Sequence, residues 1–419
     1  MINDEDSHTM PEHISSGGSP LVTEVAEWLA DQALGDAPVS EIVQGCTERL
    51  HAAGLPLWRC MLGYRTLHPL FASITLIWKR DEDFEHVQHT HENVFKSDEW
   101  LKSPMNYLLE RRLPFMRRRL QGENALLDFD ILKKMRDQGG TDYLLFIVPF
   151  VSEGSEIKAY QEVNGVLGSW ATDRPGGFTD QDILDLKRIQ RRLAVACKVQ
   201  IKNQIAKNVL TTYLGMDAGD KVLDGQIYRG DGELIHAVMW YSDMRDSTPL
   251  AAALSNEEFL ALLNTYFECT AGAVLAHNGE VLRFIGDAVL AIFPINDEPQ
   301  AAQKACANAL AAMRTAGDNM NKVNQAREAE GLKAIHYGLS LHLGDVVYGN
   351  IGVPERLEFS VVGPAANEAA RLEGLTKELK QQVLISEDFV ASSPGNFTSL
   401  GKHKMRGVGG AMEVFAPVD

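Results

Sequence analysis

The pattern of apolar and polar residues is most informative in the C-terminal half of the chain. Residues 236–243 form an apolar run, His-Ala-Val-Met-Trp-Tyr-Ser-Asp, which predicts a strand that ends at Asp243. Residues 281–293 form two apolar runs around Gly286 and Asp287, which predicts a β-hairpin with that dipeptide in its turn. Together, this strand and hairpin can bring two carboxylates to one edge of a sheet.

The same half also contains longer stretches with helical periodicity. Helices are expected over residues 249–254, 256–277 and 299–330. A strand is expected over residues 335–343, and Gly344-Asp345 separates it from another strand-like run before residues 357–372. This second domain is expected to begin near Gly230.

The N-terminal half predicts a smaller domain that mixes helices and strands. A helix-like segment covers residues 21–34, and strand-like runs follow at residues 58–64, 73–78, 143–151 and 163–171. Because helical patterns separate these runs, we expect an α+β domain of the size of a sensor domain. Thr179 is expected to cap the next helix, with Asp182 nearly completing a capping box.

A long helix is expected from Asp180 onward. Its apolar residues recur at helical spacing, first at Leu186, Ile189, Leu193 and Ala196, and after a phase shift at Ile201, Ile205 and Val209. Such a helix can pair in a parallel dimer, or its first half can pack on its own domain. The expected regions are a disordered tail, a sensor domain, a helical linker and a second domain, at residues 1–18, 19–178, 179–229 and 230–419.

Composition narrows the classes of function. The chain has 419 residues and a formal net charge of −17, so a nucleic-acid partner, which needs clustered Lys and Arg, is not expected. The five cysteines lack C-x-x-C spacing, which favours reduced thiols over disulfides or zinc. Neither a signal peptide nor a membrane-spanning run is expected, and we therefore predict a cytoplasmic protein.

Asp243 and Asp287 are candidate metal ligands. Mg²⁺ prefers hard oxygen ligands, usually one or two carboxylates together with substrate phosphates. Without a metal, two close carboxylates repel each other, which raises the pKa of one of them. The alternative for Asp243 is a helix N-cap and the alternative for Asp287 is a turn residue, and the segments described next favour the metal pair.

Four segments of the second domain together resemble the catalytic domain of the class III nucleotidyl cyclases, the adenylate/guanylate cyclase family. They occur in the family's order, at residues 240–248, 283–287, 359–372 and 405–408. The resemblance covers nearly half of the chain. It implies a ferredoxin-like domain, α+β or α/β in class, with a mostly antiparallel central sheet and flanking helices.

The resemblance implies a phosphorus–oxygen lyase in which a ribose 3′-oxygen attacks the α-phosphorus and pyrophosphate leaves. Two Mg²⁺ or Mn²⁺ ions would be held by Asp243, Asp287 and the backbone carbonyl of Met244, and would stabilise the attacking and leaving oxygens. The following residues lead into a helix whose free N–H groups suit the β- and γ-phosphates. These substrate-binding residues are Asp246, Ser247 and Thr248.

Asn367 and Arg371 are four residues apart, so they share one face of a helix. In the family the Asn orients the ribose, and the Arg stabilises the pentavalent phosphorus with its planar fork of donors. The alternative for Arg371 is an ion pair with Glu368 or Glu373 on a solvated face. Arg406 matches a basic position that the family directs at the terminal phosphates, and its alternative is a surface arginine.

Base selection in the family depends on two positions. Adenylate cyclases have a Lys four residues before the second metal aspartate and an Asp or Thr seven residues before the Asn, whereas guanylate cyclases have Glu at the first position. This chain has Arg283 and Ser360 there. Arg283 can donate to adenine N1, and Ser360 can accept from the N6 amino group. ATP is therefore favoured over GTP.

By resemblance, the site lies at a homodimer interface, with the metal aspartates from one chain and Arg283, Ser360, Asn367 and Arg371 from the other. We expect an adenylate cyclase that converts ATP to 3′,5′-cyclic AMP and pyrophosphate under the control of its N-terminal domain. The alternatives are a cyclase for GTP or a pyrimidine triphosphate, and a non-catalytic nucleotide-binding signalling module.

The N-terminal domain resembles a GAF-type sensor domain at residues 163–170 and 175–184, where a strand precedes a Phe-Thr-x-x-Asp helix start. The resemblance allows an unidentified small-molecule ligand. His86, His89 and His91 form a cluster in which the last two would share one face of a strand. This spacing allows a metal or haem role, although an exposed polar edge is the favoured interpretation.

Overall fold

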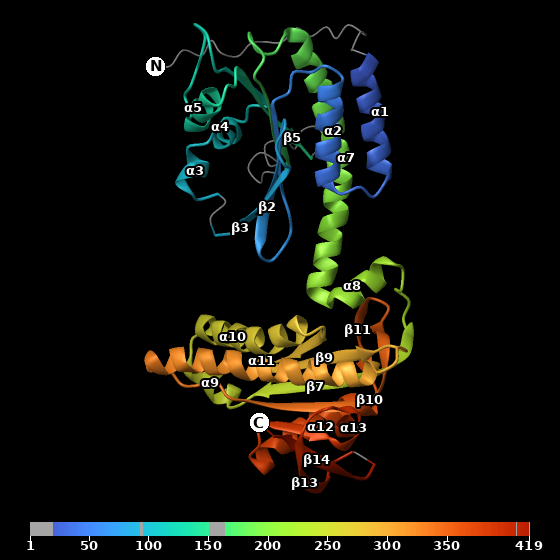
Figure 1. Ribbon diagram of the computed structural model, residues 1–419. Helices are drawn as coiled ribbons and strands as arrows, with labels where there is room; N and C mark the ends of the chain where they lie inside the picture. Colours follow the sequence, from blue (N-terminus) through green and yellow to red (C-terminus); the bar gives the residue numbers. More distant parts are fainter. Residues whose placement is uncertain (1–19, 93–94, 151–163, 408, 419) are drawn as a thin grey trace. The chain divides into compact units, whose positions relative to one another are not determined.

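The computed structural model describes residues 20–92, 95–150, 164–407 and 409–418. Within it the chain divides into two units, Met1–Val209 and Leu210–Asp419 (Figure 1). The expected disordered tail, residues 1–18, lies outside the described residues. So do Val151 and Val163, at the ends of two expected strands, and Val408.

The first unit contains one antiparallel sheet with helices on both faces. Its strands are β1 (Arg59–Arg65), β2 (Phe71–Lys79), β3 (Glu85–Thr90), β4 (Phe115–Arg119), β5 (Asp142–Pro149) and β6 (Gly165–Thr172). Its helices are α1 (Pro20–Leu34), α2 (Val39–Ala52), α3 (Asp98–Leu101), α4 (Pro104–Glu110), α5 (Asp130–Asp137) and most of α7 (Asp180–Leu214). The strand order is β3-β2-β1-β6-β5-β4.

Two apolar clusters fix the helices on this sheet. Leu29 of α1, Leu50 of α2 and Leu193 of α7 pack on one face. Leu108 of α4 and Leu132 of α5 pack on the other, and Figure 1 shows the two groups of helices on opposite sides of the sheet. The expected α+β class is confirmed for this unit.

The strand-like runs in the sequence correspond to β1, β2, β5 and β6. The pattern does not predict β3 and β4, which form the two edges of the sheet. Their side chains are mostly exposed or only partly buried. Because an edge strand buries little, its sequence need not alternate between apolar and polar residues.

The histidine cluster lies on or next to the edge strand β3. His89 Nε2 is 3.0 Å from Thr75 Oγ1, and His91 Nε2 is 2.8 Å from the His68 carbonyl oxygen. No group of three His, Cys, Asp or Glu residues that could hold a metal ion occurs among the described residues. The geometry therefore favours the exposed polar edge over a metal or haem site.

Helix α7 begins with the capping box suggested by the sequence. Thr179 Oγ1 accepts a hydrogen bond from Asp182 N at 3.2 Å, and Asp182 Oδ2 accepts one from Thr179 N at 2.7 Å. The apolar positions up to Ile201 are buried in the first unit: Leu186, Ile189, Leu193 and Ala196. The first half of the helix thus packs on its own domain, which was one of the two interpretations.

The second unit is built on one large sheet. Its strands are β7 (Gly232–Met244), β8 (Glu280–Ile285), β9 (Ala288–Ile295), β10 (Tyr337–Val353), β11 (Arg356–Val362), β12 (Val383–Ser386), β13 (Phe397–Lys404) and β14 (Ala411–Pro417). The order is β13-β14-β12-β10-β7-β9-β8, and β11 pairs with β10. The pairing of β10 with β12 is parallel, and the other pairings in the described residues are antiparallel.

Helices cover both faces of this sheet. They are α8 (Met216–Leu223), α9 (Ser247–Ala253), α10 (Asn256–Ala276), α11 (Ala301–Ala329), α12 (Pro364–Leu379) and α13 (Glu387–Ser392). Val238 and Trp240 of β7 pack with α10 and α11, whereas Ala237 and Met239 pack with α8 and α12. The alternation follows from the two-residue period of a strand. A mostly antiparallel sheet with flanking helices is the architecture expected from the sequence.

By length and composition, α10 is the one described helix that is apolar enough to cross a membrane. Its residues Leu262, Tyr266 and Val274 are buried in the apolar cluster it shares with β9 and α11. This packing is that of a core helix.

The expected interruption at Gly344-Asp345 is wrong, because β10 continues through it to Val353. Gly344 keeps its place opposite Ala237 of β7. A Cβ atom at Gly344 would lie 2.7 Å from the Cβ of Ala365. The glycine therefore allows α12 to pack closely on the strand, and it does not mark a turn.

Candidate active site

Asp243 and Asp287 lie next to each other at the end of the sheet. Asp243 stands opposite Ala288, the first residue of β9, in the ladder between β7 and β9. Asp287 directly precedes Ala288 in the β8–β9 turn, where Gly286 has a φ of 64° that favours glycine. Met244 N lies 3.4 Å from the carbonyl oxygen of Asp287. The register thus brings both carboxylates to one sheet edge.

The environment of the pair opposes two negative charges. Burial raises the pKa of Asp243, and the charge of Asp287 and a hydrogen bond with it raise that pKa further. Lys377 and Arg245 lower it, and Lys377 Nζ lies 3.7 Å from Asp243 Oδ2. A cation placed between the carboxylates would relieve the repulsion.

The ligand atoms suit a hard divalent cation. Asp243, Asp287 and the peptide carbonyl of Met244 supply oxygen only, and no third acidic, His or Cys side chain joins them among the described residues. Mg²⁺ commonly binds through one or two carboxylates and completes its shell with water and substrate phosphates. A structural zinc site would need four nitrogen or sulfur ligands. The residues therefore fit Mg²⁺ or Mn²⁺.

A buried ion pair fixes α12 against the end of β7. Arg245 Nη1 lies 3.1 Å from Glu373 Oε1, and Arg245 also donates to the Thr376 hydroxyl. The Glu373 side chain is 5% exposed. A Cβ atom at Gly338 would collide with both members of the pair, so glycine leaves room for them in this arrangement. This anchor places the C-terminal half of α12 beside Asp243.

Arg371 faces solvent on α12, four residues after the exposed Asn367. Its two possible carboxylate partners are occupied, because Glu373 pairs with Arg245 and Glu368 Oε2 lies 3.0 Å from His342 Nε2. No ion pair of Arg371 is recorded in the part of the chain that the structure describes. The solvated ion-pair interpretation of Arg371 is therefore not supported, and its guanidinium is available for a ligand.

The residues expected to contact phosphates lie in two turns. Asp246 has a left-handed backbone (φ 55°), precedes α9 and makes no side-chain capping hydrogen bond. Ser247 and Thr248 begin that helix. Arg406 is exposed in the turn between β13 and β14. No hydrogen bond or ion pair in the described residues joins these residues, Asn367 or Arg371 to the aspartate pair.

The two expected base-selecting residues occupy different environments. Arg283 of β8 forms an ion pair with Glu358 of β11, and Arg283 Nη2 lies 2.6 Å from Glu358 Oε2. Ser360, two residues further along β11, is only 2% exposed. Of the two expected residues, only Arg283 is therefore accessible at the surface. The carboxylate of Glu358 lies beside it, and the sequence did not identify this residue.

Sequence reasoning also missed the charged residues that support the aspartate pair, namely Arg245, Glu373 and Lys377. The spacing gives a partial signal, since Glu373 and Lys377 are four residues apart and share one face of α12. Their partners, Arg245 and Asp243, lie at the end of β7, more than a hundred residues away in the sequence. Only the packing of α12 on the sheet brings these groups together.

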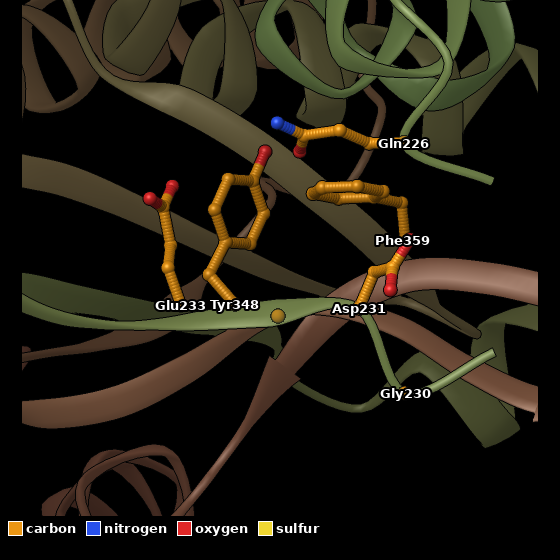
Figure 2. Close-up of a pocket in the computed structure, with 7 residues that line it drawn as sticks. Gln226, Gly230, Asp231, Glu233, Tyr348 and Phe359 are labelled. Atoms are coloured by element: carbon orange, nitrogen blue, oxygen red, sulfur yellow. The ribbon is translucent and has the colours of Figure 1, made fainter. Parts of the chain in front are cut away.

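A surface cavity of about 420 Å³ lies near the start of β7 (Figure 2). Figure 2 shows the rings of Tyr348 and Phe359 side by side in it, with the carboxylate of Glu233 beyond Tyr348. Lys221 Nζ of α8 lies 4.6 Å from the Tyr348 ring centre and 2.5 Å from Glu233 Oε1. Lys221 therefore ties helix α8 to β7 through Glu233 and to β10 through Tyr348.

Comparison with known proteins matches residues 234–416 to the family described as the adenylate and guanylate cyclase catalytic domain. Adenylate cyclase 1 of Rhizobium meliloti is 33% identical over 182 residues, which are 42% of this chain and 27% of that protein. An adenylate cyclase of Anabaena cylindrica is 33% identical over 162 residues, 38% of this chain and 31% of that protein. The chain thus spans about a third or less of these relatives. Residues 234–416, which match the family, include Asp243, Asp287, Asn367 and Arg371.

Solved structures of cyclases are also similar to part of this chain. The adenylyl cyclase CyaB from P. aeruginosa is 22% identical with a TM-score of 0.41, covering 45% of this chain and 96% of that one. A bacterial light-regulated adenylyl cyclase is 28% identical with a TM-score of 0.37, covering 44% and 91%. The guanylyl cyclase Cya2 is 26% identical with a TM-score of 0.38, covering 44% and 92%.

Proposed function

Residues 234–416 form a class III adenylate and guanylate cyclase catalytic domain, and on this premise we propose that the chain converts ATP to 3′,5′-cyclic AMP and pyrophosphate. One observation carries the proposal: Asp243 and Asp287 share a sheet edge while Asn367 and Arg371 are exposed on one helix. The presence of both the aspartate pair and the Asn–Arg pair favours a catalytic domain over a module that only binds nucleotide. Both relatives described above are named adenylate cyclases.

Asp243, Asp287 and the Met244 carbonyl would hold two Mg²⁺ or Mn²⁺ ions. When bound, such ions stabilise charge on the attacking 3′-oxygen and on the leaving pyrophosphate. Arg245 and Glu373 hold the Asp243 strand against α12, so that the carboxylates meet the substrate in a fixed geometry.

The other side chains bind and orient the substrate. Arg371 directs its fork of N–H donors at the α-phosphoryl group, where negative charge builds up during the displacement. Asn367 hydrogen-bonds the ribose and fixes the position of its 3′-hydroxyl. The N–H groups after Asp246 and the Arg406 guanidinium receive the β- and γ-phosphates.

We propose that a homodimer completes the site. In one chain no hydrogen bond or ion pair between described residues links Asn367 or Arg371 to the aspartates, and this separation supports a site to which a second copy contributes. Two copies related by a two-fold axis would form two equal sites. The first unit would act as a cytoplasmic sensor of GAF type, and α7 and α8 would transmit its state.

The test is to incubate the purified chain with each of the four ribonucleoside triphosphates and Mn²⁺, and to identify the products by mass spectrometry. Cyclic AMP as the main product supports the proposal. Cyclic GMP or a cyclic pyrimidine nucleotide as the main product would change the proposed substrate and leave the proposed reaction unchanged. Absence of a cyclic product from all four, with ATP bound at equilibrium, would support a non-catalytic nucleotide-binding module.

A further inference from the structure

The ion pair between Arg283 and Glu358 joins two strands that are not neighbours in the sheet. β8 is an edge strand of the main sheet, whereas β11 pairs only with β10. The two side chains remain accessible, at 38% exposure for Arg283 and 52% for Glu358. A donor and an acceptor of opposite charge are therefore presented together at the surface.

Ser360 is not accessible at the surface beside Arg283. It lies two residues from Glu358 on the same face of β11, but it is only 2% exposed. Association with a second chain can only bury it further. Glu358 is the accessible hydrogen-bond acceptor nearest to Arg283 on this strand.

Arg283 also has unused hydrogen-bonding capacity. Its Nη2 contacts Glu358, while its Nε is buried without a hydrogen-bond partner among the described residues. A buried donor without a partner lowers stability unless a ligand or water satisfies it. Arg283 is thus held by Glu358 at Nη2, while its Nε has no hydrogen-bond partner in the part of the chain that the structure describes.

We propose that Glu358, and not Ser360, is the residue that accepts a hydrogen bond from the substrate base, and that Arg283 and Glu358 read the base as a pair. This inference rests on the proposed function, because it concerns the base of the same nucleotide. Glu358 is thus a specificity-determining residue that the sequence motif does not identify.

The chemistry of the pair matches the edge of adenine. Adenine offers the ring nitrogen N1 as an acceptor beside the N6 amino group, which is a donor. Arg283 donates and never accepts, whereas an ionised Glu358 only accepts. A hydrogen bond to a charged group contributes more than one between neutral groups. The carboxylate therefore discriminates between bases with and without the amino group.

The decisive experiment compares ATP with purine riboside 5′-triphosphate, which lacks only the 6-amino group. Wild type, Glu358→Gln and the control Glu355→Gln are assayed with Mn²⁺ for kcat/KM. Glu355 is an exposed residue in the turn between β10 and β11, three residues before Glu358. Thermal unfolding of all three proteins checks that the substitutions leave the fold intact.

We expect wild type and Glu355→Gln to prefer ATP over the analogue by on the order of tenfold, and Glu358→Gln to lose most of that preference. The activity of Glu358→Gln with the analogue should stay close to wild type. An unchanged preference in Glu358→Gln would overturn the inference and leave an ordinary surface ion pair.

Binding measurements separate this inference from the proposed function. Isothermal titration of the same proteins with ATP and with the analogue reports base recognition even when no cyclic product forms. A protein that lacks turnover but shows the Glu358-dependent preference in binding would contradict the cyclase proposal alone. Equal affinities for both nucleotides in wild type would contradict the base-reading pair.

Discussion

Asp287 is the residue whose loss should affect turnover most directly. Asp287→Ala removes one of the two carboxylates that meet at the β7–β9 edge. We expect cyclic nucleotide formation to fall by about a hundredfold or more, because the divalent ions that would stabilise the developing negative charge lose one of their carboxylate ligands. Product formation over time, measured by mass spectrometry, checks this. Asp297→Ala, in the exposed turn after β9, should retain activity, and turnover by Asp287→Ala near that of the control would refute the metal assignment.

His342 should make the second unit less stable in mild acid. Burial lowers the pKa of His342, and this outweighs the opposing effect of Glu368 and Asp388. The unfolded chain therefore binds more protons than the folded chain as pH falls below about 6.5, so the free energy of unfolding decreases there. Urea denaturation at pH 8 and pH 5.5 measures this loss.

The matched variants for that measurement are His342→Gln and His336→Gln. His342→Gln cannot take up a proton and should show a smaller loss of stability between the two pH values. His336 is exposed, so its replacement should leave the wild-type loss unchanged. An equal pH dependence in all three proteins would show that His342 is not the group responsible.

At the residue scale, the sequence predicts site residues that belong to a local pattern. It does not predict site residues whose partners are brought near only by packing. The apolar runs around Asp243 and Asp287 are local, and they imply a register that joins the two residues. The ion pair of Glu373 could not be predicted in this way. Its partner Arg245 lies far away in the sequence, whereas the helical spacing pointed to Arg371 as the partner. Glu358 was missed for the same reason, since its partner Arg283 lies on β8.

At the element scale, the elements that bury a full face could be predicted, and the edges could not. β5 and β6 are almost entirely buried and read as apolar runs. β3 and β4 lie at the sheet edges and carry mixed sequences. Gly344 misled the prediction of β10, because a glycine required by the packing of α12 looks like a turn in the sequence.

The start of α7 offers a test at this scale. Thr179→Ala removes the hydroxyl that accepts from Asp182 N. We expect the free energy of unfolding of the first unit to fall by about 1 kcal/mol, the usual contribution of a capping side chain. Urea denaturation followed by circular dichroism measures the change. Thr212→Ala, an exposed position near the other end of the same helix, should cause no loss, and a similar loss in both variants would contradict the capping role.

At the scale of the whole molecule, the motifs predicted the catalytic domain because its segments keep their order over nearly two hundred residues. The motifs do not predict which groups one chain brings together. Within one chain the aspartate pair is contacted by Lys377 and supported by Arg245, whereas Asn367 and Arg371 are directed to solvent. We propose that a second copy of the chain completes a site divided in this way.

Mixing inactive variants tests that division. Asp243→Ala and Arg371→Ala should each be inactive alone. Co-expressed with two different tags, they should form mixed dimers in which one of the two sites is intact. Random pairing gives about a quarter of the wild-type activity, since half of the dimers are mixed and each has one good site.

The control pairs Asp243→Ala with Asp287→Ala. In a mixed dimer of these two, each site takes its aspartates from a single chain, so both sites carry a lesion and the mixture should stay inactive. Recovery in this control would mean that the two aspartates of one site come from different chains, which the β7–β9 register of a single chain opposes. Failure of the first mixture to recover, with mixed dimers isolated through both tags, would show that Asp243 and Arg371 act in one chain. The shared site would then be excluded, while the metal pair itself would remain supported by the loss of turnover in Asp287→Ala.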